Sequence, residues 1–375
     1  MPTQSLYACA WLKRKGPTMG ERPTARTQVA SESGYHSPQL DVDVRLNTNE
    51  SPFPPPPGFV EAVAEAARGI DWNRYPDRSA TKLRSALAER YGVTPAQVFA
   101  ANGSNEVLQS LLLAYGGAGR SVAVFEPTYA MYSQIARTTG TGLVKGRRGA
   151  DFDLDSGYAC QLVLGERPDV VILCSPNNPT GTPAAGGLVV DLEEVVGTYG
   201  GLLVVDEAYG EFAPESAVDL VSEDRCVVVS RTFSKTWAMA GARLGYLIAP
   251  SWCVAELEKV VLPYHLDALK LEVGVLALEH AAAMEERVES LVAERDRVAE
   301  ALALLPVTTW PSAANFILLR PESRSGGEVW QDLVDRSVLV RDFTTMPGLE
   351  GCLRVTMGSR AENDIFLNAL REALR

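Results

Sequence analysis

Residues 227–235 read Val227-Val228-Val229-Ser230-Arg231-Thr232-Phe233-Ser234-Lys235. Three successive β-branched residues are typical of a strand that is buried on both faces. Hydroxyl-bearing residues follow them, and Lys235 stands where such a strand would end. Arg243 comes eight residues later, within the segment 241–245. A lysine held at a strand end, among hydroxyls and with an arginine close behind, is equipped to form an imine beside a phosphate group.

Short apolar runs of the same kind flank this stretch on both sides. They cover residues 121–125, 170–174, 202–205, 226–229 and 246–248. Such runs predict strands of a mostly parallel sheet with both faces covered. Most of the segments between them are long enough to carry the helices that parallel connections need. The sequence therefore predicts an α/β layer architecture.

Helices are expected before and after this sheet. Residues 59–68 are rich in Ala and Glu, and residues 79–91 place Leu83 and Leu87 four positions apart on one helical face. Residues 266–303 contain almost no Gly or Pro and predict one or two long helices that join a second domain. That domain shows strand patterns at 314–319, 338–340 and 353–356, and a closing helix at 362–374. A single continuous domain is the alternative that the pattern leaves open.

The bulk properties exclude several classes of partner. The 375 residues carry a formal net charge of -12, which argues against nucleic acid and against an acidic membrane surface. A few local arginines can still bind an anionic small molecule. No apolar stretch reaches membrane-spanning length. The six cysteines show no Cys-x-x-Cys pair, so we expect a reduced, cytoplasmic compartment. His36, His265 and His280 are too scattered to predict a metal site.

Polar or aromatic groups follow four of the predicted strands at their carboxyl ends. Asp206 ends the run 202–205, residues 176–181 follow the run that ends at Cys174, and residues 126–129 follow Phe125. Lys235 is the fourth case. Ligands bind at the carboxyl ends of strands in open α/β sheets, so these groups predict one shared site.

The chemistry of these residues indicates pyridoxal phosphate (PLP) as the cofactor. Lys235 would form the imine with its aldehyde and then move protons as general base and acid. Asp206 would pair with the ring nitrogen and keep it protonated, although a lone Asp at a strand end is also a common helix cap. Tyr209 and Asn178 would donate hydrogen bonds to the ring oxygen. Tyr129 would stack on the ring, although as a single residue it could equally be a packing aromatic.

The phosphate would need donors and positive charge. Ser104 and Asn105 open a helix-like segment, and their backbone N–H groups would suit a phosphate. A plain helix cap explains that motif equally well when it is taken alone. Arg243, Thr232 and Ser234 would complete the phosphate site.

These motifs together carry a resemblance to a family. From about Arg45 to the C-terminus the chain resembles the fold-type I PLP-dependent aminotransferases, and more closely the histidinol-phosphate aminotransferases. The matching segments are residues 46–50, 73–77, 101–106, 175–181 and 206–209, Ser234-Lys235, Arg243, and residues 351–356. The spacing of Asp206, Lys235 and Arg243 is specific for the superfamily. The Arg-Tyr-Pro-Asp motif at 74–77 and the stretch from Arg341-Asp342 to Leu353-Arg354 are more specific for the branch.

The resemblance implies further roles. Tyr75 would reach the cofactor phosphate of a neighbouring subunit, so the active unit would be a homodimer. Arg354 would bind the α-carboxylate of the amino acid, Arg341 would help to hold a substrate phosphate, and Asn49 would lie near the substrate. Phe53 stands where many relatives have Tyr, so a substrate contact made by that hydroxyl would be missing.

The resemblance also implies the fold, and together with the change of sequence pattern after Pro263 it gives the division into domains. We expect PLP-dependent transferase fold type I, with a mostly parallel mixed sheet in a large domain and a smaller α+β domain. Residues 1–30 would form a disordered tail, and residues 31–68 an arm that contributes to the small domain. Residues 69–265 would form the PLP-binding domain, and residues 266–375 the rest of the small domain.

The activity that the resemblance implies is amino transfer between glutamate and imidazole-acetol phosphate, giving histidinol phosphate in histidine biosynthesis. Two other enzymes remain open at this point, an aromatic or broad-range aminotransferase and a phosphothreonine decarboxylase. A non-catalytic binding module with the same fold is the alternative from another class. The presence of Lys235, Asp206 and Arg243 together argues against that module.

Overall fold

The computed structural model describes residues 23–30, 34 and 38–375. The chain divides into two compact units, residues 1–35 and residues 36–375. In the first unit, α1 (Thr27–Ala30) is one helical turn inside the segment predicted as a tail. Residues 1–22, which make up most of that predicted tail, lie outside the described residues. The second unit holds the two sheets found among the described residues.

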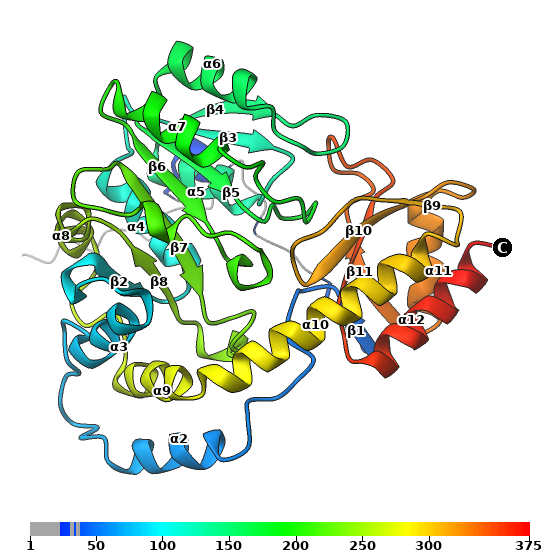
Figure 1. The fold of residues 1–375 in the computed structure, drawn as a ribbon, viewed down its shortest axis with the longest axis horizontal. Coiled ribbons are helices and arrows are strands. Elements are labelled where there is room, and N and C mark those ends of the chain that lie inside the picture. The colour runs from blue at the N-terminus through cyan, green and yellow to red at the C-terminus, as the bar shows by residue number, and fades with distance from the viewer. Residues whose placement is uncertain (1–22, 31–33, 35–37) are drawn as a thin grey trace, which may run out of the picture. The chain divides into compact units, whose positions relative to one another are not determined.

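The larger sheet has seven strands, and Figure 1 shows them fanned across the large half of the second unit. Their order is β2-β8-β7-β6-β5-β3-β4. The strands are β2 (Val98–Ala101), β3 (Ser121–Glu126), β4 (Gly142–Arg147), β5 (Val170–Cys174), β6 (Leu202–Asp206), β7 (Val227–Thr232) and β8 (Gly245–Ile248). Each of the five apolar runs forms a strand, which confirms the predicted mostly parallel sheet.

Strand β8 runs antiparallel to both of its neighbours, β7 and β2. The short connection from β7 to β8 carries Lys235 and has no crossover helix, so the chain returns beside the strand it has just left. Strands β2 and β4 were not expected from the sequence. In β4 most side chains are exposed or half-buried because it lies at the sheet edge, and its apolar pattern is correspondingly weak.

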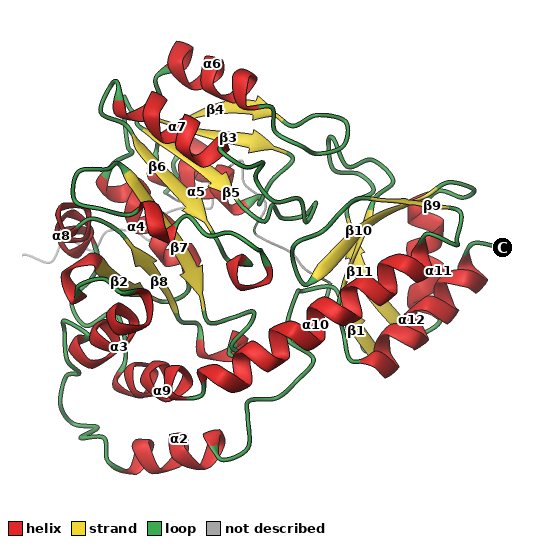
Figure 2. Ribbon diagram, viewed as in Figure 1, coloured by secondary structure: helices red, strands yellow, loops and turns green. Residues whose placement is uncertain are grey.

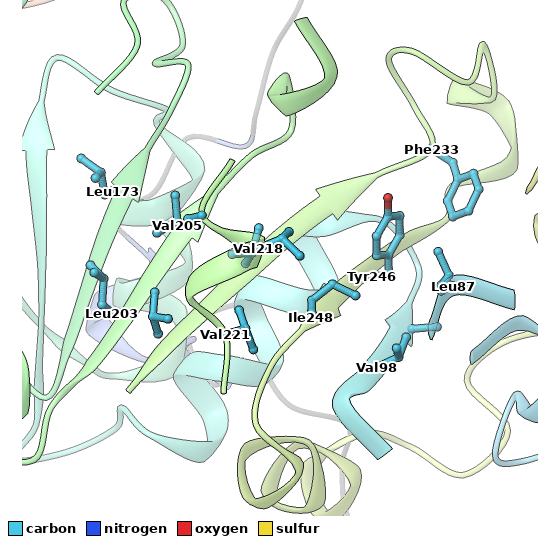
Figure 3. Packing of buried hydrophobic residues seen from close by; sticks show 14 of the residues in the cluster. Leu87, Val98, Leu173, Leu203, Val205, Val218, Val221, Phe233, Tyr246 and Ile248 are labelled. Carbon is cyan, nitrogen blue, oxygen red and sulfur yellow. The ribbon is translucent and has the colours of Figure 1, made fainter. Parts of the chain in front are cut away.

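Helices cover both faces of this sheet. One face packs against α4 (Ser104–Ala114), α5 (Met131–Thr139) and α8 (Ser251–Val260). The other packs against α3 (Thr81–Tyr91), α6 (Ser156–Glu166), α7 (Leu188–Gly197) and α9 (Ala268–Glu279). Val204 lies in the first core and Val205 in the second, so successive residues of β6 are both buried. Figure 3 shows the second core, with Leu203, Val205, Tyr246 and Ile248 packed between strands and helices.

The smaller sheet has five strands in the order β1-β11-β12-β10-β9. They are β1 (Val44–Leu46), β9 (Val307–Thr309), β10 (Phe316–Pro321), β11 (Val338–Asp342) and β12 (Leu353–Thr356). Helices α11 (Gly326–Asp335) and α12 (Arg360–Ala373) pack on it. Strand β1 pairs with β11 in parallel, so a segment near the start of the second unit joins a sheet built from its end.

Two helices link the sheets, as Figure 2 shows. Helix α9 ends at Glu279, and α10 (Ala281–Leu302) begins after His280. Met284 of α10 packs in the core of the large sheet, whereas Leu291 and Leu302 pack in the core of the small sheet. Helix α2 is Phe59–Arg68, with the predicted bounds. The boundaries proposed between large and small domain, after residues 68 and 265, stay predictions because residues 36–375 form one compact unit.

Candidate active site

The predicted residues gather where β3, β5, β6 and β7 end. Asp206 is the last residue of β6, and Cys174, the last of β5, leads into residues 175–181. Lys235 lies three residues beyond β7. In the register of the sheet, Cys174 pairs with Asp206 and Asp206 pairs with Ser230. The parallel strands therefore bring segments that are far apart in sequence to one edge.

Lys235 has the properties of a nucleophilic amine. Its Nζ donates a hydrogen bond to the backbone oxygen of Thr48 at 3.0 Å and lies 6.0 Å from the centroid of the Tyr209 ring. Burial lowers the pKa of Lys235 to about 7, with the positive charges of Arg354 and Arg243 acting in the same direction and Glu50 opposing them. A substantial fraction of the amine is then neutral near pH 7, as attack on an aldehyde requires.

Asp206 is buried at the end of β6. Its side chain is 2% exposed, and it accepts hydrogen bonds from Tyr132 Oη at 2.6 Å and from the backbone N–H of Ala208 at 3.1 Å. No lysine or arginine within the described ranges forms an ion pair with it. Burial raises the pKa of Asp206 to about 6, and the neighbouring Glu207 adds to this shift. A protonated ring nitrogen would supply the missing positive charge.

Tyr209 and Asn178 meet beside Lys235. The Tyr209 hydroxyl accepts hydrogen bonds from Asn49 Nδ2 at 2.8 Å and from Asn178 Nδ2 at 3.5 Å. Burial raises the pKa of Tyr209, so the hydroxyl keeps its proton and can donate it to a ligand oxygen. Asn178 Oδ1 in turn accepts from Arg354 Nη1 at 2.5 Å. The predicted ring-oxygen and carboxylate sites are thus adjacent.

The phosphate site predicted at the start of α4 is tightly packed. Gly103 precedes the helix with φ 83°, and a Cβ atom added to it would lie 2.9 Å from Arg243 Nη2. Gly245 of β8 approaches the same turn, because an added Cβ would meet the Gly103 carbonyl carbon at 2.5 Å. Arg243 itself has a left-handed backbone, φ 51°, and donates to Ser234 Oγ at 3.1 Å. The arginine, the serine and the helix N-terminus therefore share one small volume.

Four further predicted residues lie around this volume. Ser104 and Asn105 form the first turn of α4. The Tyr129 hydroxyl donates to Asn105 Oδ1 at 3.3 Å, which connects the predicted stacking ring to the phosphate site. Thr232 Oγ1 donates to the Leu244 backbone oxygen at 3.3 Å and accepts from the Ser234 N–H at 3.1 Å, so this hydroxyl holds the turn before Lys235.

Arg341 and Arg354 face each other across two strands. They are register partners in the antiparallel pair of β11 and β12. Both guanidinium groups lie over the Phe343 ring, at 5.7 Å and 5.4 Å from its centroid. Two guanidinium groups this close on neighbouring strands can both contact one anionic ligand, because each offers a fork of N–H donors.

Tyr75 does not join the other predicted residues. Its side chain is 80% exposed and stacks on the Tyr264 ring with centroids 4.4 Å apart. It lines a surface cavity of about 420 Å³ together with Arg74 and Ala268. A role in the site of its own chain is not supported by this position, and a role across a subunit interface stays a prediction.

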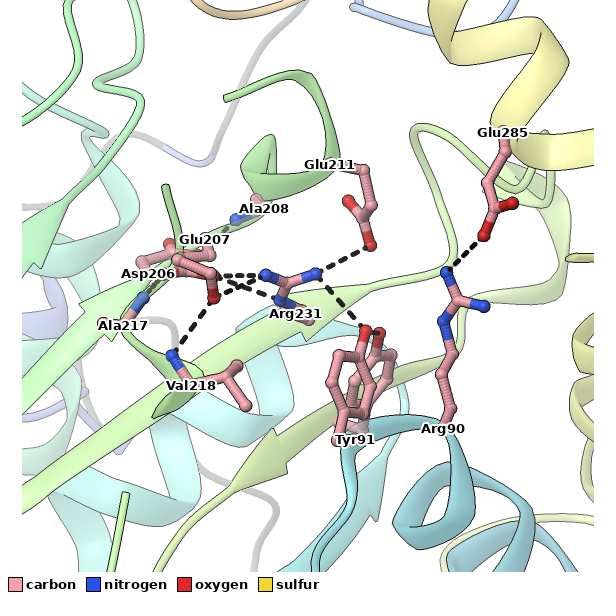
Figure 4. A network of polar contacts seen from close by, with 12 residues as sticks. Arg90, Tyr91, Asp206, Glu207, Ala208, Glu211, Ala217, Val218, Arg231 and Glu285 are labelled. Carbon is pink, nitrogen blue, oxygen red and sulfur yellow. Dashed lines mark hydrogen bonds and ion pairs between the residues drawn. The ribbon is translucent and has the colours of Figure 1, made fainter. Parts of the chain in front are cut away.

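Sequence reasoning missed two features of the site. Tyr132, the hydrogen-bond donor to Asp206, lies 74 residues away from it in the chain. The second feature is a buried ion pair between Arg231 and Glu207, with nitrogen and oxygen 2.5 Å apart, which Figure 4 shows beside Asp206. Arg231 also approaches Glu211 at 3.4 Å and donates to Tyr91 Oη at 3.3 Å. The alternation of side chains along β7 was the available signal, since it puts Arg231 on the opposite face from Ser230.

The residues present fit PLP. The uncompensated carboxylate of Asp206 suits a ring nitrogen cation, the amine of Lys235 suits an aldehyde, and the Gly103–Arg243 contact closes around an anion. This chemistry, on a mostly parallel seven-stranded sheet, defines a PLP-dependent transferase of fold type I. The chain belongs to the aminotransferase class I and II family, whose model matches residues 42–370.

Individual relatives cover most of the chain. A histidinol-phosphate aminotransferase of Frankia casuarinae is 45% identical over 361 residues, which are 93% of this chain and 90% of the relative. That of Thermobifida fusca is 45% identical over 358 residues, 93% of this chain and 95% of the relative. The crystal structure of histidinol-phosphate aminotransferase from Sinorhizobium meliloti in complex with PLP is similar with a TM-score of 0.86 and 25% identity, covering 96% of this chain and 99% of that one.

Among the described residues, no group of His, Cys, Asp and Glu is arranged to hold a metal ion. Within the same part of the chain, no helix is long and apolar enough to cross a membrane.

Proposed function

We propose that this chain is a histidinol-phosphate aminotransferase of histidine biosynthesis. It would exchange an amino group between glutamate and 2-oxoglutarate on one side and histidinol phosphate and imidazole-acetol phosphate on the other. The observation that carries the substrate assignment is the opposed pair Arg341 and Arg354 beside Asn178. Relatives with 40–45% identity over nearly the whole chain carry the same name, which supports the proposal.

PLP, when bound, supplies an aldehyde for the amino group and a ring that withdraws electrons from the substrate. Lys235 would hold the cofactor and then, once released by substrate, carry a proton on Nζ. Its lowered pKa of about 7 suits both directions of proton transfer near neutral pH. Asp206 would hold a proton on the ring nitrogen, and Tyr209 and Asn178 would hold the ring oxygen. Tyr129 would fix the plane of the ring.

The remaining cofactor contacts would anchor the phosphate. Ser104 and Asn105 would offer backbone N–H groups at the start of α4, where the helix dipole favours negative charge. Arg243 and Ser234 would add a guanidinium group and a hydroxyl. Thr232 would act mainly by holding the Ser234 turn, because its hydroxyl already bonds the Leu244 oxygen.

The two arginines explain how one pocket would take both substrates. Arg354 would bind the α-carboxylate, because its guanidinium group is held by Asn178 and by the backbone oxygen of Asn47 at 3.0 Å. Arg341 would bind the phosphate of histidinol phosphate or the second carboxylate of glutamate. A guanidinium fork suits either anion. Asn49, bonded to Tyr209 and to Thr356, would complete the wall next to the substrate.

Assembly and location complete the proposal. The active unit would be a homodimer in which Tyr75 reaches the cofactor phosphate of the neighbouring subunit. The exposed Tyr75 and the cavity beside it support this placement. The enzyme would work in the cytoplasm, which suits free thiols such as Cys160 and Cys226.

A panel of half-reactions tests the substrate assignment. Holoenzyme would be mixed with histidinol phosphate, phenylalanine or phosphothreonine, and conversion of the cofactor followed by absorbance. We expect the fastest conversion with histidinol phosphate and no release of carbon dioxide from phosphothreonine. Equal rates with phenylalanine would support a broad-range aminotransferase instead, and carbon dioxide release would support a decarboxylase.

The variant Arg341→Ala sharpens this panel. With the phosphorylated donor, the variant would lose a desolvated ion pair, so kcat/KM should fall roughly a hundredfold, which corresponds to a few kcal/mol. Phenylalanine should lose far less. Arg320→Ala removes an exposed arginine of β10 in the same sheet and serves as the control. Equal losses for both donors in Arg341→Ala would contradict the phosphate role.

A further inference from the structure

Tyr132 contacts both the Asp206 carboxylate and the ring of Tyr129, which is predicted to stack on the cofactor. It lies in the first turn of α5 and is 1% exposed. Its hydroxyl donates to Asp206 Oδ2 at 2.6 Å. Its ring meets Tyr129 edge-on, with centroids 5.5 Å apart and an angle of 85° between the planes. One buried side chain therefore touches two of the groups that would face the cofactor.

Tyr132 is an important hydrogen-bond donor to the Asp206 carboxylate. Within the described residues, Asp206 accepts from one side chain, Tyr132, and from one backbone group, the N–H of Ala208. The two donors bind different carboxylate oxygens, so together they fix the rotation of the carboxylate about its Cβ–Cγ bond. Without the phenol, Oδ2 would be a buried acceptor with no side-chain partner, and the charged form of Asp206 would be disfavoured.

The surroundings of Tyr132 keep it in the donor form. Burial and the charge of Asp206 raise the pKa of Tyr132 well above its usual value, so the phenol stays protonated. Cys174 of β5 and Arg148, which follows β4, are the other titratable groups nearby. The Arg148 guanidinium group donates to the backbone oxygens of Phe125 at 3.3 Å, Phe152 at 3.2 Å and Cys174 at 3.4 Å.

We propose that Tyr132 is a positioning residue, which orients the Asp206 carboxylate and keeps it the weaker base in its contact with the ring nitrogen of PLP. The proposal rests on the function proposed above. The proton would then stay on the ring nitrogen, because the phenol stabilises the ionised carboxylate. If the phenol were removed, Asp206 would gain basicity and take a larger share of that proton. The ring would withdraw electrons less well, without any direct contact between Tyr132 and the substrate.

The variant Tyr132→Phe tests the role, because it keeps the buried ring and removes only the hydroxyl. We expect the pH midpoint of the visible absorbance of the holoenzyme to rise by about half a unit or more, since less positive charge would remain on the ring. The value of kcat should fall about tenfold or more, as for loss of a hydrogen bond to a charged group, while KM changes little. Tyr132→His, which can still donate, should recover part of both effects.

Tyr246→Phe is the matched control. Tyr246 is equally buried and its hydroxyl lies 2.6 Å from that of Tyr91, with no contact to Asp206. The Tyr246→Phe variant should leave the pH midpoint of the visible absorbance unchanged. If Tyr132→Phe does not give folded protein, Tyr132→His and Tyr132→Leu provide the same contrast between a donor and none.

The outcomes separate the two proposals. An unshifted midpoint and unchanged kcat in Tyr132→Phe, or an equal shift in Tyr246→Phe, would overturn the role of Tyr132 alone. An unmodified enzyme that binds PLP and transfers no amino group would overturn the proposed function instead. A shifted midpoint confined to Tyr132→Phe, with recovery in Tyr132→His, supports the inference.

Discussion

Replacing Asp206 by asparagine should stabilise the protein without its cofactor, and the gain should grow with pH. Burial raises the pKa of Asp206 from 3.8 to about 6. A carboxyl whose pKa is higher in the folded state favours folding while it is protonated and opposes folding once it is ionised. Its cost to stability is absent below about pH 3.8, grows as pH rises from 3.8 to about 6, and is complete above that. At 1.36 kcal/mol per unit, about two units correspond to about 3 kcal/mol.

Urea unfolding of the cofactor-free protein between pH 4 and pH 8 measures this directly. The free energy of unfolding of Asp206→Asn minus that of the unmodified protein should increase by about 2.5 kcal/mol from pH 4 to pH 7.5, because part of the cost is already present at pH 4. The slope with pH isolates ionisation from any constant change in hydrogen bonding to Tyr132 and Ala208. Asp151→Asn, at an exposed position, is the control for the general effect of removing one carboxylate.

Adding PLP should reverse the stability advantage of Asp206→Asn over the unmodified protein. A protonated ring nitrogen would pair with the ionised carboxylate, so saturating cofactor should stabilise the unmodified protein more than Asp206→Asn. A free-energy difference that stays flat from pH 4 to pH 8, or that falls with pH, would refute the reasoning. It would mean that Asp206 is solvated or already paired with a cation.

Three further predictions follow from other contacts of the structure. Glu207→Gln should lower the free energy of unfolding by about 3 kcal/mol, because it removes the nearer of the two carboxylates that pair with the buried Arg231 and leaves Glu211 at 3.4 Å, and the double variant with Arg231→Met should lose less in urea unfolding; a loss below about 1 kcal/mol in the single variant would contradict the buried pair. Gly181→Ala should lower the thermal midpoint of unfolding, because the φ of Gly181 is +80° and an added Cβ would lie 2.7 Å from Ser312 Cβ. Gly165→Ala should not lower it, because the space around Gly165 is open. Equal midpoints for both variants would count against the contact. Mixing inactive Tyr75→Ala subunits with inactive Lys235→Ala subunits should restore activity in the mixed dimers, and no recovery would argue against the role of Tyr75 across the interface.

The large sheet could be predicted because its strands are buried on both faces. Runs such as 170–174 and 202–205 are wholly apolar, and every residue of β5 is buried. The same reasoning failed for β4, because an edge strand needs fewer apolar residues, and Lys145 and Arg147 hide its pattern. The direction of β8 could not be read from its own residues. It depends on the connection through Lys235, residues 233–244, which forms turns in place of a crossover helix.

Within the site, the residues next to strand ends were accessible to sequence reasoning and those held by tertiary packing were not. Asp206 and Lys235 follow apolar runs, so their place at the sheet edge is implied by the pattern. Tyr132 reads as an ordinary core residue of an amphipathic helix, and only the packing of α5 on β6 aims its hydroxyl at Asp206. The opposition of Arg341 and Arg354 likewise depends on the register of β11 against β12, which a sequence alone does not fix.

The account depends on where PLP becomes attached. Holoprotein treated with borohydride and digested should yield, by mass spectrometry, a single pyridoxyl-modified peptide that carries the label on Lys235. A label on another lysine, such as Lys270 near the phosphate site, or complete labelling of a Lys235→Ala variant, would contradict it.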